Sequence, residues 1–211
     1  MSLEFRVEVD PEIASTVRPL TWRTGPLRVV NRDERMDPFI VATSDRMRTA
    51  PEPTDVIAAV RTMYKRFGID PTKTRPSSEA LLRRIRRGDA LPRINSLVDI
   101  INWTSLETQL SFGLYDAAAV CGPVTMRRGR DGEEYAGIRK DVVHVAGRLV
   151  LADADGPFGN PTSDSARTMV TTSTADALVV IYAPAGVADA MALHARTLTE
   201  ARIDQFCRTV E

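Results

Sequence analysis

The stretch LPRINSLVDIINW (residues 91–103) carries three polar residues, Asn95, Asp99 and Asn102, at helical spacing within a mostly apolar segment. Intervals of four and three residues place them on one face of a helix. An apolar stripe of the kind that faces a core lies beside them: Ile94, Leu97, Val98 and Ile101. Because a helix that is apolar on more than one side is usually enclosed, its polar groups need partners. We expect the polar stripe to bond either to the protein's own backbone or to a ligand.

The whole chain has the composition of an ordinary soluble domain. Its 211 residues are 43% hydrophobic and 27% charged, without repeats, so we expect one domain over residues 1–211. The 28 acidic and 28 basic side chains balance, so net charge does not indicate a nucleic-acid partner, and no DNA partner is expected. No apolar run approaches about 20 residues and the start lacks the pattern of a secretion signal. These features predict a cytoplasmic protein that does not contact a membrane.

Cysteine and histidine are too scarce for several common kinds of site. The chain has only Cys121, Cys207, His144 and His194, which predicts neither a disulfide framework nor a metal site. There is no Gly-x-Ser-x-Gly motif, no phosphate-binding glycine loop and no Cys/His signature. We expect no cofactor and assign no catalytic residue.

Acidic residues after position 150 form a weaker candidate. Asp153, Asp155 and Asp164 could supply acid or base chemistry, although aspartate in sequence rich in glycine and proline commonly makes turns. The segment DGPFGNP (residues 155–161) reads as a loop, and its length indicates that it could wall a pocket. Both interpretations of the aspartates stay open.

Periodicity predicts helices in the first half of the chain and one at its end. We expect helices over residues 54–67, 77–87 and 91–107, and from Gly186 to Phe206. Gly68 and Gly88 would stop the first two. Alternative caps are available for those two helices: Thr54 or Asp55, and Ser77 or Ser78.

Strand patterns dominate the rest. Residues 5–9 and 27–30 read as short strands, and residues 124–138 as two short runs around an Asp131-Gly132 turn, a hairpin signal. Residues 141–153 and 176–184 add strands rich in valine. SFGLYD (111–116) would lead into a short turn or helix. Helices, then strands, then a closing helix predict an α+β fold, with a mixed or antiparallel sheet covered by the helices.

Four arginines lie together in the sequence RRIRR of the second predicted helix: Arg83, Arg84, Arg86 and Arg87. They fit a solvated outer face near the C-terminal end, where cations also suit the helix dipole. The alternative, which the overall neutrality of the chain weakens, is a patch that contacts RNA phosphates, joined by Arg61, Lys65 and Arg66 from the preceding helix.

Several of these stretches together resemble a known family. RPSSEALLRRI (75–85), LPRINSLVDIINWTSLE (91–107), GLYD (113–116), GRLVLAD (147–153) and SDSARTMVTTSTADALVVIYA (163–183) are similar to the B3/4 domain, over roughly residues 27–185. This module occurs in the beta subunit of bacterial phenylalanyl-tRNA synthetase and in free-standing proteins. The sequence of this chain is most similar to the free-standing branch.

In the synthetase the domain is similar to an editing site that hydrolyses tyrosine wrongly attached to the phenylalanine tRNA. The resemblance places Asn102 at the family's pocket asparagine, but Ile101 stands where the family has threonine and Gly113 where it has histidine. The glutamate that reads the tyrosine hydroxyl would fall near Tyr182. Such a site distinguishes tyrosine by a hydrogen bond to the tyrosine hydroxyl. Because these polar residues are replaced in this chain, we do not expect tyrosine editing here.

The resemblance implies that the 91–103 helix forms one wall of a small-molecule pocket. The residues expected to bind the ligand are Arg93, Asn95, Asp99, Asn102, Ser105, Tyr115 and Asp116. Asn95 and Asn102 would offer amides, Asp99 would orient them or bind a ligand amine, and Arg93 would tether its turn or pair with a carboxylate.

Two functions are consistent with this sequence. The first is a hydrolase that deacylates misacylated tRNA in trans, with tRNA or aminoacyl-tRNA and an amino-acid-like group as partners. The second is a module that binds an amino acid or RNA without chemistry, suggested by the lost polar residues at Ile101 and Gly113. The first two hypotheses have about even weight, because a fold by itself does not determine function. A protein-interaction domain with a filled pocket is a third, weaker hypothesis.

Overall fold

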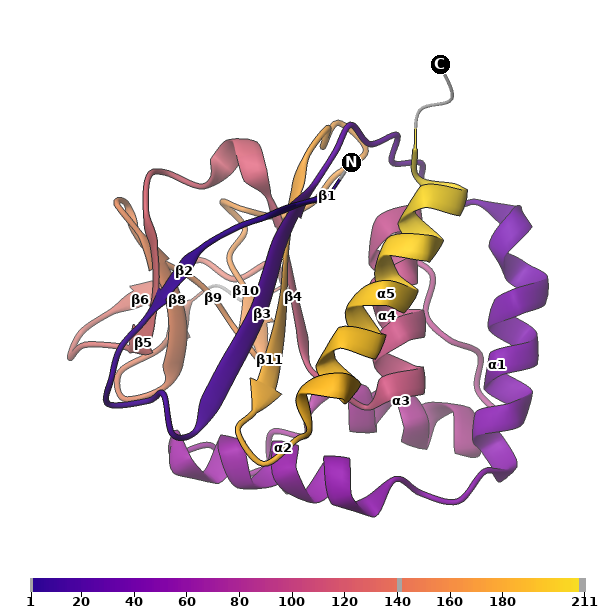
Figure 1. The fold of residues 1–211 in the computed structure, drawn as a ribbon, viewed down its shortest axis with the longest axis horizontal. Helices are drawn as coiled ribbons and strands as arrows, with labels where there is room; N and C mark the ends of the chain where they lie inside the picture. The colour runs from indigo at the N-terminus through magenta and orange to yellow at the C-terminus, as the bar shows by residue number, and fades with distance from the viewer. Residues whose placement is uncertain (1, 140–141, 209–211) are drawn as a thin grey trace.

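The protein is an α+β structure in which a central sheet separates a layer of helices from a second sheet (Figure 1). The computed structural model describes residues 2–139 and 142–208. Four helices lie on one side of the central sheet, with α4 and α5 against it and α1 outermost: α1 (Asp37–Thr49), α3 (Ser77–Arg86), α4 (Ser96–Thr108) and α5 (Asp189–Phe206). Helix α2 (Thr54–Arg66) runs along the lower edge in Figure 1 and packs against both layers of apolar residues. The α+β prediction is confirmed.

The central sheet is antiparallel, with strand order β1-β3-β11-β4. Its strands are β1 (Ser2–Glu4), β3 (Val17–Thr24), β11 (Ala177–Pro184) and β4 (Phe112–Asp116). All eight residues of β11 are buried, because both faces of this strand are covered. Residues such as Val179 face the helices, whereas alternate residues such as Val180 face the second sheet. This explains why residues 177–184 form a continuous apolar run instead of an alternating one.

The second sheet has strand order β10-β9-β8-β5-β2. Its strands are β2 (Val7–Val9), β5 (Val124–Arg128), β8 (Leu149–Asp153), β9 (Gly156–Asn160) and β10 (Ser163–Asp164). The pairing of β2 with β5 is parallel and the others are antiparallel. A separate pair consists of β6 (Glu134–Tyr135) and β7 (Val143–His144). The chain therefore has two packed sheets where the sequence predicts one.

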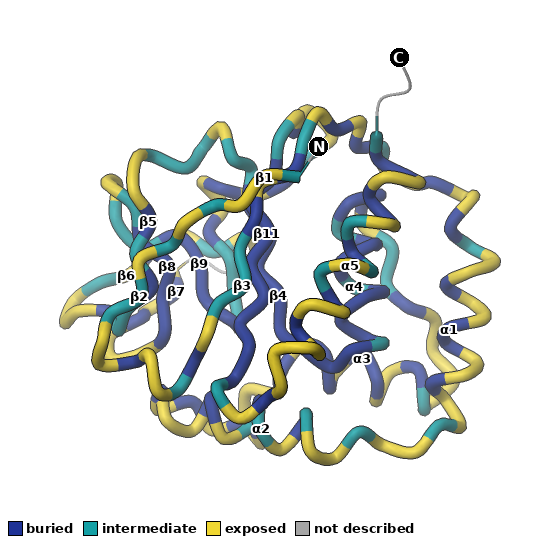
Figure 2. The backbone as a smooth tube through the Cα atoms, in the orientation of Figure 1, coloured by how far each residue is buried: buried dark blue, intermediate teal, exposed yellow. Residues whose placement is uncertain are grey.

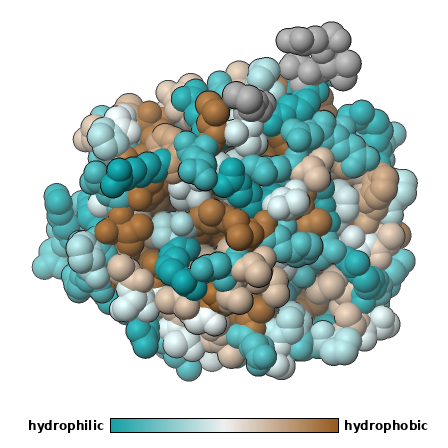
Figure 3. Space-filling model, in the orientation of Figure 1, coloured by the Kyte–Doolittle hydropathy of each residue, from teal (hydrophilic) through white to brown (hydrophobic). Residues whose placement is uncertain are grey.

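Two apolar cores follow from these layers, one on each face of the central sheet. In Figure 2 the buried segments include β11 and β4 of that sheet and helix α4. One core lies between the helices and the central sheet and includes Trp22, Leu97 and Trp103. The other lies between the two sheets and includes Tyr115 and Phe158. Burying a large apolar side chain contributes roughly 1.5–3 kcal/mol. On the face shown in Figure 3, apolar atoms gather around a hollow over the strands, among hydrophilic groups.

The predicted helices are confirmed, but the third begins at Ser96 and not at residue 91, and the caps of the first two differ. Helix α2 ends before Gly68 (φ +69°) and α3 before Gly88 (φ +90°), a backbone conformation that favours glycine. The predicted caps are wrong, because α2 and α3 follow Pro53 and Pro76 and have no side-chain cap. A proline in this position restricts the residue before it and introduces the helix through its fixed φ. The last predicted helix begins at Asp189, three residues after Gly186.

Two strand predictions need correction, whereas the short turn or helix expected after residues 111–116 is present as the 3-10 turn η2 (Ala117–Ala119). Residues 27–30 are not a strand, since Leu27 and Arg28 donate backbone hydrogen bonds to two different loops. The hairpin at residues 124–138 is wrong, because β5 pairs with β8 and β2 while β6 pairs with β7. The turn, with Gly132 at φ +77°, and two short strands, β5 and β6, on either side of it are as predicted, and only the pairing of these strands differs. Residues 112–116 form strand β4, and η2 follows it.

The remaining predictions are met in part. Residues 5–9 contain β2, and residues 142–153 contain β7 and β8, whereas residue 141 lies outside the described residues. Helix α1, preceded by the 3-10 turn η1 (Glu34–Met36), and strand β3 have no counterpart in the sequence predictions. Within the described residues, no helix is long and apolar enough to cross a membrane.

Candidate ligand-binding cavity

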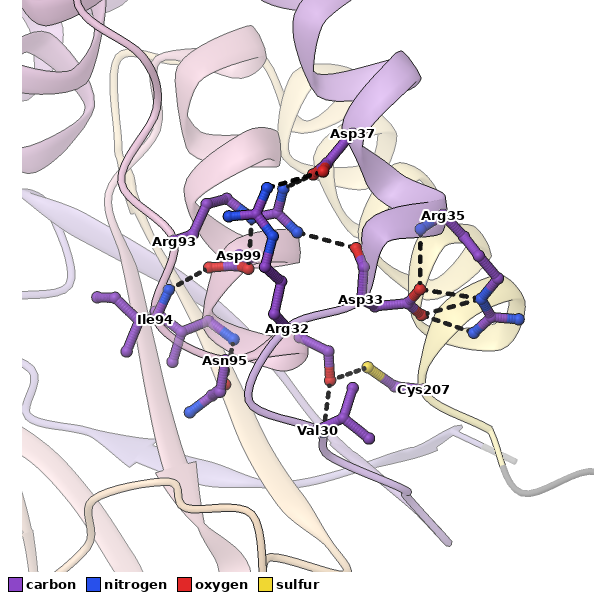
Figure 4. Close-up of polar contacts among 12 residues, drawn as sticks. Val30, Arg32, Asp33, Arg35, Asp37, Arg93, Ile94, Asn95, Asp99 and Cys207 are labelled. Atoms are coloured by element: carbon purple, nitrogen blue, oxygen red, sulfur yellow. Dashed lines mark hydrogen bonds and ion pairs between the residues drawn. The ribbon is translucent and has the colours of Figure 1, made fainter.

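The start of α4 is held by its own polar residues (Figure 4). The Asn95 side chain accepts a hydrogen bond from the Val98 amide at 2.9 Å and so caps the helix. Asp99 is fully buried and accepts from the Ile94 amide at 2.7 Å and from Arg93 Nε at 2.7 Å. Two residues of the polar stripe thus bond to the protein itself, which is one of the two outcomes expected from the sequence.

Arg93 ties this turn to the beginning of α1. Its guanidinium pairs with Asp37 and donates to the Asp33 carbonyl at 2.9 Å, in addition to its bond with Asp99. Figure 4 shows these groups converging between α4 and α1. Since a buried carboxylate is costly without a partner, Arg93 is the residue that allows Asp99 to be charged inside the protein.

Beyond this network, α4 forms one wall of a cavity of about 410 Å³. Asn102 and Ser105 line it from α4, and Phe112 and Leu114 line it from β4. The opposite wall is residues 160–164, the turn from β9 to β10 together with β10 itself. A volume of this size is within the usual range for small-molecule sites. Asn160 and Pro161 of the 155–161 segment line the cavity, as predicted, but the prediction of a loop is wrong, because residues 156–160 form strand β9, paired with β8.

The cavity walls are mainly apolar. Ile94, Ile138 and Met169 are lining residues that are also exposed, at 45%, 44% and 37%, so they lie at the opening. Ser105 Oγ donates to the Leu110 carbonyl at 2.8 Å, which fixes the end of α4. Within the described residues, the side-chain amide of Asn102 makes no hydrogen bond to the protein and is therefore available to a ligand.

Asn160 holds the turn that forms the far wall. Its Oδ1 accepts from the Thr162 amide at 2.7 Å and from the Ser163 amide at 3.0 Å. Its Nδ2 donates to the Tyr135 hydroxyl at 2.8 Å. An asparagine that bonds to the backbone two residues ahead makes a compact Asx turn, so this wall is fixed by its own sequence.

Asp164 is a partly buried acid beside the cavity. It lines the cavity, and its Oδ1 is buried without a hydrogen-bond partner among the described residues. Burial raises the pKa of Asp164 to about 7, and the nearby Tyr115 hydroxyl offsets part of this effect. A carboxyl group with this pKa changes its charge near neutral pH.

All four tyrosines of the chain lie within electrostatic reach of Asp164: Tyr64, Tyr115, Tyr135 and Tyr182. They come from α2, β4, β6 and β11. Burial, with a further contribution from the Asp164 charge, raises the pKa of every one of them, that of Tyr64 to about 12. We call these residues the tyrosine cluster.

The tyrosine hydroxyls bond to one another or to the backbone. Those of Tyr115 and Tyr182 are 2.7 Å apart. Tyr64 donates to the Pro161 carbonyl at 2.8 Å, and Tyr135 to the Ser163 carbonyl at 2.5 Å. The cluster therefore supports the same 160–164 wall from behind.

The Tyr115 ring also explains two glycines. A Cβ at Gly113 or at Gly159 would overlap the Tyr115 hydroxyl and ring. Gly113, the position that the resemblance aligns with the family's histidine, is not a lining residue, since the cavity meets its neighbours Phe112 and Leu114. The space next to residue 113 is filled by the protein's own tyrosine.

The structure brings together only part of the predicted ligand-binding set. Asn102 and Ser105 line the cavity, whereas Arg93, Asn95 and Asp99 form the network at the start of α4. Tyr115 and Asp116 also lie outside the lining: the first belongs to the tyrosine cluster, and Asp116 accepts from Thr174 at 2.7 Å and from the Ala118 amide at 3.0 Å. The sequence assigned no role to Phe112 or Leu114, whose place depends on long-range packing.

The predicted RNA-binding arginines lie on α3 and each has a partner on the protein. Arg83 pairs with Glu79 at 3.2 Å, and Arg86 with Glu52 at 2.7 Å. Arg84 donates to the Ala90 carbonyl at 2.6 Å, and Arg87 pairs with Asp89 at 3.4 Å. Glu79 is buried and also pairs with Arg61 at 2.7 Å and with Arg75 at 3.3 Å. Ser77, at the opposite end of α3, lines the cavity.

The family of the chain follows from comparison with known proteins. A sequence model described as the B3/4 domain matches residues 59–210, more than half of the chain. The protein therefore belongs to the B3/4 domain family, as the resemblance indicated.

The chain is also similar to parts of several named proteins. The chain is 35% identical over 86 residues to the phenylalanine–tRNA ligase beta subunit of Brucella abortus (strain 2308). It is 36% identical over 91 residues to that of Xanthomonas campestris pv. campestris (strain 8004). These matches cover 40% and 43% of this chain and 11% of each relative. A crystal structure of an N-terminal fragment of the phenylalanyl-tRNA synthetase beta subunit from Pyrococcus horikoshii gives 12% identity and a TM-score of 0.49, covering 98% of this chain and 51% of that one.

Proposed function

We propose that the cavity binds the aminoacyl end of a misacylated tRNA and that the protein hydrolyses the ester bond in trans. The observation that carries the proposal is that Asn102 lines the cavity and has an uncommitted side-chain amide among the described residues. The family resemblance aligns this residue with the family's pocket asparagine. Membership of the B3/4 domain family and relatives named phenylalanine–tRNA ligase beta subunit support a link to tRNA.

The chemistry needs positioning more than a nucleophile. Water adds to the ester carbonyl carbon, the bond to the ribose oxygen breaks, and that oxygen takes up a proton, which releases the amino acid and free tRNA. The Asn102 amide can donate to the carbonyl oxygen as negative charge develops on it. Holding the ester against a fixed wall supplies the proximity that such a reaction requires.

The tRNA body would approach over α3. Ser77 lines the cavity, and the exposed ends of Arg83 and Arg87 lie six and ten residues further along the same helix. Ten residues of α-helix span about 15 Å. Phosphates near the end of the tRNA could then meet these arginines while the ester enters the cavity.

The substrate is expected to differ from tyrosine. Recognition of a tyrosine hydroxyl requires a polar side chain that can form a hydrogen bond with it. Tyr182, which lies near the position of the family's glutamate according to the resemblance, is fully buried, and its hydroxyl is already paired with that of Tyr115. The cavity walls at Ile101, Phe112 and Leu114 instead favour an apolar side chain.

A second candidate function is recognition without chemistry. The described lining residues include no histidine or cysteine, the groups that most often activate water or attack an ester. In that case the same cavity would bind an amino acid, or the end of an RNA, and release it unchanged.

The test is a deacylation time course with purified protein and a panel of correctly and wrongly charged tRNAs, beside a buffer blank and the Asn102→Ala variant. Selective hydrolysis of one misacylated tRNA, lost in the variant, is the expected result. A flat time course with retained tRNA binding would overturn hydrolysis and favour recognition alone.

A further inference from the structure

The cavity has a single acidic lining residue within the described part of the chain. That residue is Asp164, and the only basic one is Arg139, which is exposed. Asp99, the carboxylate that the sequence suggests for a ligand amine, lies outside the lining and is already paired with Arg93. A positively charged group that enters this cavity therefore meets one candidate counter-ion.

The carboxyl group of Asp164 has an unmet bonding requirement. Its Oδ1 is buried and has no hydrogen-bond partner, and no lysine or arginine of the described residues forms an ion pair with it. Among the tyrosine hydroxyls around it, that of Tyr115 interacts with the carboxyl group, whereas those of Tyr64 and Tyr135 donate to backbone carbonyls, so Oδ1 is the oxygen left without a donor. A buried polar atom left in this state calls for a donor from outside the chain.

The backbone holds Asp164 in a fixed place. Strand β10 pairs with β9 so that Asp164 lies opposite Gly159. The Asp164 carbonyl accepts a hydrogen bond from the Ile138 amide at 3.3 Å, and the Ser165 amide donates to the Phe158 carbonyl at 2.8 Å. A carboxyl group on such a fixed strand is preorganised for binding, because little freedom is lost when a ligand arrives.

We infer that Asp164 binds the ammonium group of a cationic amine whose apolar body lies against Ile101, Phe112 and Leu114. The inference rests on the proposed function, because it names the class of substrate that the same cavity would bind. An aminoacyl ester with a free α-amino group and an apolar side chain has both features. A raised pKa fits this arrangement, because a carboxyl group that lacks a cation in a dry site is easily protonated until one arrives.

The inference predicts discrimination between free and blocked amines. We would titrate the protein with L-leucinamide, L-methioninamide and L-phenylalaninamide and with their N-acetyl derivatives, using calorimetry at pH 7.5. Acetylation removes the charge and leaves the side chain unchanged. At least one free amide is expected to bind about tenfold more tightly than its acetylated form, as for one charge-assisted hydrogen bond.

Asp164→Asn should abolish this preference, and Asp131→Asn is the matched control. Asp131 lies in an exposed turn and does not line the cavity, so its variant loses the same charge and should keep the preference. If Asp164→Asn fails to fold, amide chemical shifts of the wild-type protein replace it: free amides must shift residues 159–165, and acetylated ones must not.

Either of two results would overturn the inference. One is equal affinity of the wild-type protein for free and acetylated amides, including no binding of either. The other is a preference that persists in Asp164→Asn. Amides are not cleaved in this experiment, so its outcome is separate from that of the deacylation assay, which can fail while amine binding holds.

Discussion

At the scale of single residues, Gly113 shows how tightly the tyrosine cluster is packed. Because a Cβ there would overlap the Tyr115 ring, we expect Gly113→Ala to lower the free energy of unfolding by roughly 1–3 kcal/mol, the usual effect of overpacking. Gly186→Ala is the control, since nothing lies near a Cβ at that exposed position. Urea unfolding of the two variants measures the difference, and equal stabilities would show that Tyr115 moves aside freely.

Asp164 should make stability depend on pH. Its pKa is about 7 in the folded protein, against about 3.9 in an unfolded chain. The folded state binds this proton more tightly, so the associated stability is fully present below about pH 4 and is lost as the pH rises through about 7. Relative to Asp164→Asn, the wild type should lose roughly 2–4 kcal/mol between pH 4 and pH 8.

Urea unfolding at several pH values checks this pH dependence. The tyrosines that face Asp164 have pKa values raised above their ordinary value and stay neutral throughout this range, so they do not contribute. Asp131→Asn, in an exposed turn, should follow the wild-type curve. Parallel curves for the wild type and Asp164→Asn would mean that the carboxyl group is well solvated.

At the scale of elements, the attachment of α4 to α1 depends on Arg93. Arg93→Ala leaves the buried Asp99 carboxylate without its cation, so we expect a loss of about 3–5 kcal/mol in the free energy of unfolding. Arg87→Ala is the matched control, because Arg87 is 68% exposed and its ion pair should contribute less than about 1 kcal/mol. A loss below 1 kcal/mol for Arg93→Ala would show that Asp99 is stable without this partner.

The elements differ in how far the sequence could predict them. Helices α2, α3 and α5 repeat apolar residues at helical spacing, and β11 is a long apolar run, so local pattern was sufficient. The hairpin at residues 124–138 failed because β5 finds its partners in β8 and β2, which are distant in sequence. Residues 112–116 are too short to show a period, and their strand exists because β11 pairs with them.

At the scale of the whole molecule, the cavity is a product of packing between distant segments. It lies where α4, β4 and residues 160–164 meet, and the tyrosines that support it come from four different elements. Spacing within one segment cannot predict such a meeting. The family resemblance could place Asn102 in a pocket, and the Gly/Pro-rich segment 155–161 could be recognised as a wall, although not as the strand that it forms. The importance of Asp164 depends on a carboxyl oxygen that only the fold buries.

The most direct test of the cavity as the functional site measures rate and stability together. For the misacylated tRNA that the panel selects, we would compare the initial deacylation rates and melting temperatures of the wild type and Asn102→Ala. We expect the variant to lose about tenfold or more in rate, the cost of one transition-state hydrogen bond, with a nearly unchanged melting temperature. Equal rates, or a rate loss that only accompanies a large drop in melting temperature, would contradict a functional role for the cavity.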